Sequence, residues 1–161
     1  MNDQIDRSGL YIPGLGGIYD SLSDLAYPIL RIAMGAWYIP HGWVKIIGGG
    51  VAKYNDAGAL VGGTAGFMAK MNFPIPEVLA WYIGLLELVG GALLVLGLLT
   101  RLVAIQYVGF MLVAAIFVHK ANWFWTGRGM EMPLLLLVIA VVLFIRGGGN
   151  LSIDKSMSKE F

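Results

Sequence analysis

The chain has 161 residues, of which 58% are hydrophobic and 13% are charged, and its formal net charge is +1. Soluble domains carry about 45–50% apolar and about 25% charged residues, so this composition indicates an integral membrane protein. The near-neutral charge excludes the basic field that nucleic acid requires. The absence of cysteine excludes a disulfide, a thiolate nucleophile and an iron–sulfur cluster bound by this chain.

Residues 1–24 are expected to form an N-terminal segment outside the membrane. Its start, MNDQIDRSGL, lacks the basic region and apolar core of a cleaved signal peptide. Four apolar segments follow, and lipid-exposed backbone must satisfy its hydrogen bonds internally, so each segment is expected to be a helix. The predicted fold class is an all-α membrane protein, an antiparallel four-transmembrane-helix bundle. The domain covers 25–149, with helices at about 25–47, 77–99, 101–120 and 129–147, and the tail covers 150–161.

The first predicted helix carries its polar residues on one face. At about 100° per residue, Arg31, Tyr38 and Lys45 fall within about 40° of one another, and His41 lies about 40° further round. This stripe is expected to face the bundle, because ionisable groups within a span usually avoid lipid. The alternative is that Arg31 and Lys45 snorkel from opposite ends of the helix. Pro40 removes a helix hydrogen bond and can kink the chain beside His41.

The second predicted helix contains one charged residue, Glu87. It lies ten residues into the helix, about 15 Å from its start, and therefore near the middle of the bilayer. A carboxylate at that depth should be protonated or paired. We expect a functional or pairing role, with a neutral structural carboxyl as the alternative.

The third and fourth predicted helices add polar groups at the same end of the bundle. His119 closes the third helix and Glu131 opens the fourth. The resulting cluster comprises His41, Lys45, Glu87, His119 and Glu131. At the opposite end, a structural polar cluster is expected from Arg31, Arg101, Arg146 and Asp154. We assign no metal, because the histidines and carboxylates lack the HxxEH or ExxH spacing of a metal site within one helix.

Three stretches resemble the DoxX family. They are LRIAMGAWYIPHGWVKIIGG, LLELVGGALLVLGLLTRL and the segment from HKANWFW to NLSID. The resemblance covers about residues 30–154 and implies a four-helix membrane protein. The matching positions are Arg31, His41, Lys45, Glu87, Arg101, His119, Glu131 and Asp154. One departure is Gly148, where the family often has proline.

The resemblance also implies a redox function, because family members include subunits of thiosulfate:quinone oxidoreductase. We therefore expect an integral membrane subunit of a redox complex that interacts with quinone, at most a quinone-linked oxidoreductase subunit. His41, His119 and Glu87 are the candidate catalytic residues for proton transfer. Tyr38, His41, Lys45 and Glu131 are the candidate residues for binding the quinone headgroup. The sequence holds no electron carrier, so a partner subunit would deliver electrons.

Other functions remain open at the level of sequence. The main alternative is a non-catalytic accessory or anchoring subunit of a larger respiratory or photosynthetic complex. A b-type haem between His41 and His119 is less expected, because the two residues differ in depth. The chain is short for a small-solute transporter unless it dimerises.

The expected partners and location follow from the apolar composition and the near-neutral charge. The partners are membrane lipids, other subunits of a membrane complex or a second copy of the chain, and not nucleic acid. The expected location is a prokaryotic inner (plasma) membrane, crossed several times. A slight excess of Lys and Arg at the end that holds both termini favours cytoplasmic termini.

Overall fold

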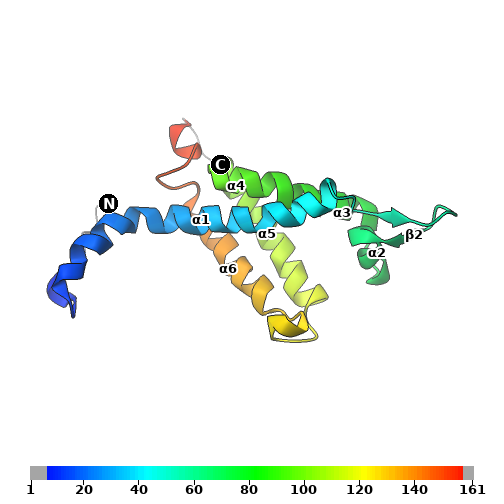
Figure 1. The fold of residues 1–161 in the computed structure, drawn as a ribbon, viewed down its shortest axis with the longest axis horizontal. Coiled ribbons are helices and arrows are strands. Elements are labelled where there is room, and N and C mark those ends of the chain that lie inside the picture. Colours follow the sequence, from blue (N-terminus) through cyan, green and yellow to red (C-terminus); the bar gives the residue numbers. More distant parts are fainter. Residues whose placement is uncertain (1–6, 158–161) are drawn as a thin grey trace.

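The computed structural model describes residues 7–157, in which four long helical segments dominate (Figure 1). They are α1 (Gly16–Ile46), the continuous run of α3 (Pro76–Leu85), η3 (Leu86–Gly90) and α4 (Gly91–Leu96), the run of α5 (Thr100–Val113) and η4 (Ala114–Val118), and α6 (Glu131–Arg146). The turns η3 and η4 are π-helical. Short 3₁₀ turns lie at η1 (Arg7–Gly9), η2 (Pro13–Leu15), η5 (Trp125–Gly127) and η6 (Asp154–Ser156).

Length and apolar composition qualify two of these segments in the described chain as membrane spans. They are Pro76–Leu96 and Thr100–Val118. The α6 helix has 16 residues, slightly below the lower limit of about 17 residues for a span. The α1 helix begins at Gly16, well before the predicted start near residue 25. The protein is therefore mostly helical, with apolar helices suited to a membrane.

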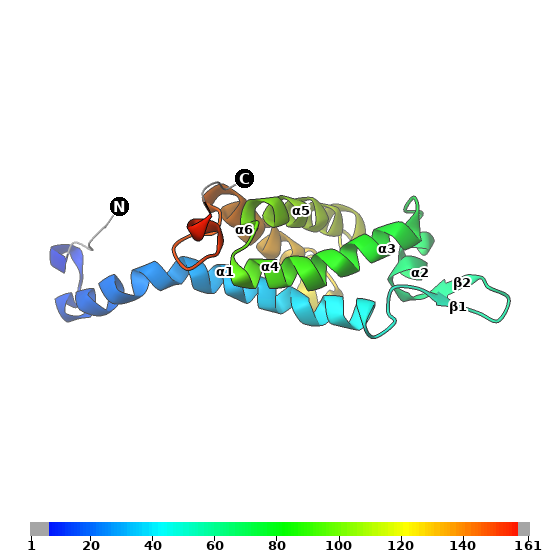
Figure 2. The ribbon, with the colours of Figure 1, turned by 90° about the horizontal axis from the view of Figure 1, so that it is seen from above.

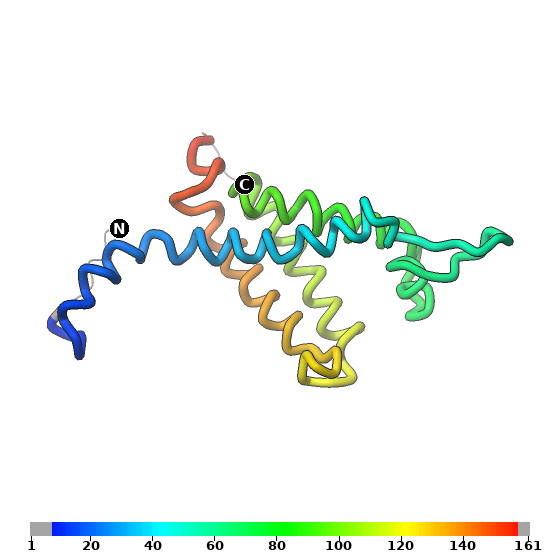
Figure 3. Tube along the Cα trace, viewed as in Figure 1, coloured from blue at the N-terminus to red at the C-terminus, as the bar shows by residue number. Residues whose placement is uncertain are grey.

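The four segments form two antiparallel pairs. The α1 helix runs beside α3, η3 and α4, and α5 runs beside α6, with the second pair crossing the first at an angle (Figures 1 and 3). Glycines bring the first pair together. A Cβ on Gly35 would lie 2.5 Å from the carbonyl oxygen of Gly91, and a Cβ on Gly42 would clash with the backbone of Leu88. These small residues let the two helix backbones approach closely.

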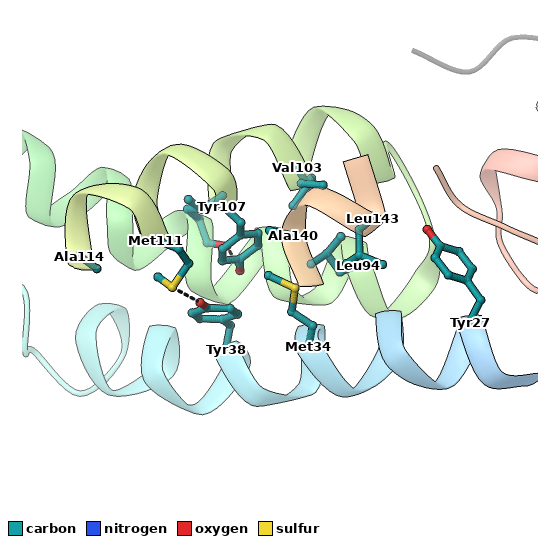
Figure 4. Packing of buried hydrophobic residues seen from close by; sticks show 12 residues of the cluster. Tyr27, Met34, Tyr38, Leu94, Val103, Tyr107, Met111, Ala114, Ala140 and Leu143 are labelled. Carbon is teal, nitrogen blue, oxygen red and sulfur yellow. Dashed lines mark hydrogen bonds between the residues drawn. The ribbon is translucent and has the colours of Figure 1, made fainter. Parts of the chain in front are cut away.

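The core lies where the two pairs cross. Met34 and Tyr38 from α1 pack against Tyr107 and Met111 from α5 (Figure 4). The rings of Tyr38 and Tyr107 stack with their centroids 4.4 Å apart, and the Tyr38 hydroxyl donates to the sulfur of Met111 over 2.9 Å. Tyr38 therefore faces the bundle and not lipid.

A β-hairpin corrects the all-α prediction. Strand β1 (Lys53–Tyr54) pairs antiparallel with β2 (Leu60–Gly62), and α2 (Gly63–Lys70) follows directly. Between the strands, the side-chain oxygen of Asn55 accepts hydrogen bonds from the backbone N–H groups of Ala57 and Ala59. This local turn chemistry closes the hairpin, as asparagine commonly does.

The α2 helix, which follows the hairpin, packs against the bundle. A second buried cluster joins the loop after α1, α2 and α3 through Val51, Ala65, Met68 and Ala80. This packing fixes α2 against the end of α3 (Figure 2). As a result, α2 forms one wall of a cavity at this end of the bundle.

Candidate functional site

A cavity of about 1280 Å³ lies at the end of the bundle where α1 ends and α6 begins. Its walls come from α1, α2, α3, η3, α5, η4, α6 and the loop before α6, and most lining residues are apolar. The polar and ionisable residues among them are Tyr38, His41, Lys45, Thr64, Glu87, His119 and Arg128. The structure thus brings together five of the six residues expected in the catalytic or headgroup-binding sets.

An ion pair between Lys45 and Glu87 is the main polar feature of the cavity. The Nζ of Lys45 on α1 donates to Oε2 of Glu87 on η3. The Glu87 side chain is 5% exposed and that of Lys45 is 20% exposed. A carboxylate this deep needs a counter-charge, and Lys45 supplies it. An ammonium has three N–H donors, so two remain after this bond.

The two histidines differ in their surroundings. His119 is half-buried, and its Nδ1 lies 2.6 Å from the carbonyl oxygen of Arg128. Since a carbonyl can only accept, Nδ1 carries the hydrogen, which leaves Nε2 of the neutral ring as a hydrogen-bond acceptor. His41 is exposed, and its ring lies 6.4 Å from that of Trp37. Among the described residues His41 makes no hydrogen bond, so its ring is available to a ligand.

Two π-helical turns border the cavity. Glu87 belongs to η3, while Ala114 and Val118 of η4 line the wall directly before His119. In η3, the Tyr107 hydroxyl donates to the carbonyl oxygen of Leu86 over 2.9 Å. Single π turns inside α-helices occur frequently at functional sites. Composition and periodicity carry no signal for such turns, so the sequence did not predict them.

Glu131 does not line the cavity. Its Oε2 accepts the backbone N–H of Trp125 over 2.9 Å, which holds the loop before α6. Because this carboxylate is occupied by the loop, the geometry favours a positioning role over the expected headgroup contact. Trp37 and Met111, in contrast, line the cavity without having been predicted. Tryptophan and methionine on an apolar helix give no sequence signal that separates a cavity wall from ordinary packing.

The second polar cluster joins the C-terminal segment to the helix hairpin at the other end of the bundle. Arg31 is fully buried and donates to the backbone carbonyls of Leu94, Val95 and Leu151. Asp154 accepts the N–H of Leu99 over 2.7 Å and that of Thr100 over 2.8 Å, and so caps α5.

The other two members of this cluster lie nearer the surface. Arg101 donates to the carbonyl oxygen of Ile145 over 3.4 Å, and the guanidinium of Arg146 lies 4.7 Å from the ring centroid of Tyr27. The Tyr27 hydroxyl itself donates to the carbonyl of Gly147. Together these contacts fasten the segment after α6 to α1 and α5.

Comparison with known proteins identifies the family. The DoxX family model matches residues 26–120, which include the ion pair and both histidines. The chain belongs to the DoxX family. The expected resemblance is confirmed, and with it the assignment to a family of helical membrane proteins.

Two curated relatives extend the match beyond that region. "Inner membrane protein YqjF" of Escherichia coli is 33% identical over 144 residues, which are 87% of this chain and 98% of that protein. "Putative oxidoreductase CatD" of Bacillus subtilis is 28% identical over 131 residues, 81% of this chain and 86% of that protein. No solved structure matches this chain.

Proposed function

We propose that this DoxX protein is a quinone-interacting subunit of a membrane redox complex and that the cavity beside Lys45 and Glu87 is its quinone site. The observation that carries the proposal is the placement of this ion pair in the wall of a large, mainly apolar cavity. Ligand sites of this kind combine apolar walls with a few precisely placed polar groups. The relative from B. subtilis, "Putative oxidoreductase CatD", supports a redox role.

The residues present fit a quinone headgroup. Lys45 has two N–H donors beyond its bond to Glu87, and either can bind a carbonyl oxygen. The Tyr38 hydroxyl donates to the sulfur of Met111, a weak acceptor that a carbonyl oxygen can replace. The aromatic rings of Trp37 and Phe110 line the same cavity and can pack on a flat ring.

A bound quinone would supply reversible redox chemistry coupled to proton uptake. In this site Lys45 stabilises negative charge that develops on a carbonyl oxygen. His41 can exchange protons with solvent because it is exposed. The Glu87 carboxylate can accept a proton and pass it on. The Nε2 of His119 can accept a proton and pass it to a bound ligand or to water, which restores the neutral ring. The electrons would come from a partner subunit, because a chain without cysteine cannot bind an iron–sulfur cluster or carry a redox-active thiol pair.

We further propose that all four long helical segments cross the inner membrane with cytoplasmic termini. The α1 and α6 helices join the two apolar runs Pro76–Leu96 and Thr100–Val118. The name of the E. coli relative supports an inner-membrane location. Reporter fusions at both ends of the chain test the orientation, and opposite locations of the two reporters would contradict an even number of spans.

Binding of quinone to purified protein tests the proposed site. Trp37 and Trp125 line the cavity, so quinone analogues should quench the tryptophan fluorescence of protein in detergent micelles. Lys45→Met should weaken binding about tenfold, equivalent to about 1.4 kcal/mol, whereas Lys70→Met, on the exposed end of α2, should leave it unchanged.

Lipid extracts of natively purified protein complete the test. We expect a quinone to accompany the wild-type protein and to be depleted in Lys45→Met. If no quinone copurifies and both variants titrate like the wild type, the cavity is not a quinone site. A non-catalytic accessory role would then account better for the same polar contacts.

A further inference from the structure

We propose that the N-terminal arm, defined as residues 16–26 of α1, lies in the membrane interface with lipid covering its apolar side. This inference is independent of the quinone proposal, because the arm lies at the opposite end of α1 from the cavity. Lipid is the partner that the surface of the arm fits.

The length of α1 leaves the arm outside the bundle. The helix has 31 residues, which corresponds to about 46 Å, whereas the hydrocarbon core is about 30 Å thick. Figure 2 shows the first turns of α1 projecting beyond the neighbouring helices. The arm must therefore be covered by something other than this bundle, or its apolar side chains face water.

One side of the arm is apolar and exposed. The exposed fractions of Ile18, Leu22 and Leu25 are 53%, 53% and 38%. At about 100° per residue these three positions fall within about 60° of one another. The stripe continues without a break into Ile29 and Ile32, which are 61% and 40% exposed on the outer face of the bundle.

The opposite side of the arm is polar. Asp20 and Asp24 fall on the face of α1 that, further along, buries Tyr27 and Arg31 against the bundle. The apolar stripe thus points outward, in the direction in which a membrane protein meets lipid. If α1 crosses the membrane as proposed above, this stripe continues the surface of α1 that faces lipid, which favours lipid over a protein partner. Because the arm carries carboxylates, the association should not depend on anionic lipids.

Pro28 lets the arm change direction. A proline lacks the N–H that would bond to the carbonyl of Asp24, and helices kink at such positions. Pro28 itself is buried in the bundle, so the kink would lie at the point where α1 leaves its neighbours. A turn there allows residues 16–26 to follow the membrane surface instead of extending into water.

Single cysteines can test the arm directly, because the chain has none of its own. We would label full-length Leu22→Cys and Asp24→Cys with an environment-sensitive fluorophore after reconstitution into phosphatidylcholine vesicles. The two positions are both exposed and lie about 160° apart around the helix. The Leu22→Cys label should be quenched several-fold more strongly by a spin label on the upper acyl chain. The Asp24→Cys label should be quenched several-fold more strongly by aqueous iodide.

Replacing part of the lipid with phosphatidylglycerol should leave this pattern unchanged. Two outcomes would overturn the proposal. Equal iodide quenching at both positions would place the arm in water. Intermolecular disulfide formation by Leu22→Cys, with neither label reached by lipid, would show that a second copy covers the stripe. Unchanged melting temperatures of both variants would establish that the substitutions leave the bundle folded.

Discussion

Lys45 and Glu87 form an ion pair that joins α1 to the π-helical turn η3 in the wall of the cavity. The two residues are 42 positions apart in sequence and meet because glycines bring their helices into close contact. One side chain of the pair reaches the cavity surface and the other is nearly enclosed. The pair therefore holds two helices together and also presents the Lys45 ammonium to a ligand in the cavity.

Removing one partner of this pair should destabilise the protein. Glu87→Gln leaves the Lys45 ammonium without its counter-charge, and we expect a loss of about 2 kcal/mol in the free energy of unfolding. The loss stays below that for a fully buried pair because Lys45, 20% exposed, can turn toward solvent. Lys45→Met should cost more, because the Glu87 side chain, only 5% exposed, loses its counter-charge.

The double variant Lys45→Met with Glu87→Gln provides the control. It removes both charges, so its loss should be smaller than the sum of the two single losses. Unfolding of the four proteins in one detergent measures this coupling. Strictly additive losses would mean that the two charges do not stabilise each other.

Asp154 should be required for the start of α5. Its two carboxylate oxygens accept the N–H groups of Leu99 and Thr100. Asp154→Ala should lower the free energy of unfolding by about 1–2 kcal/mol, as expected for loss of a helix cap. Asp154→Asn, which keeps one acceptor oxygen, should lose less. Asp56→Ala in the exposed hairpin loop is the matched control, and a similar loss there would argue against a specific cap.

Arg31 should hold the C-terminal segment in place. It links α1 to the carbonyl of Leu151 and to the end of α4. Arg31→Met removes all of these donors, so the segment after Gly147 should be cleaved by a protease several-fold faster than in the wild type. Arg31→Lys keeps the charge but not the planar set of five donors, so intermediate cleavage is expected. Wild-type cleavage rates in Arg31→Met would show that other contacts suffice.

The approach of α1 to η3 should tolerate no added methyl group at Gly42. A Cβ there would clash with the backbone of Leu88, while a Cβ on Gly109 in α5 would meet nothing within 4 Å. Gly42→Ala should therefore lower stability by about 1–3 kcal/mol through overpacking. Gly109→Ala should be neutral or stabilising by up to about 1 kcal/mol, because alanine favours helix. Equal thermal unfolding of the two variants would contradict this packing.

The sequence alone determined that this protein is a helical membrane protein and which family it belongs to. The apolar runs and low charge indicated a helical membrane protein, and three stretches including the HG pattern at His41 indicated the DoxX family. The shared face of Arg31, Tyr38 and Lys45 followed from helical periodicity, which depends on residues close together in the chain. The same reasoning required Glu87 to be either protonated or paired, because a lone charge within a span is costly.

Tertiary structure decided which residues meet. Periodicity does not set the offset between two helices, so it could not select Lys45 as the partner of Glu87, or direct Glu131 to the N–H of Trp125 and away from the cavity. The two π turns could not be predicted either, because one added residue in a helical turn does not change the composition. The β-hairpin depends on the Asn55 turn and on the packing of α2 against α3. Helix character is local, whereas a cavity exists only where distant segments come together.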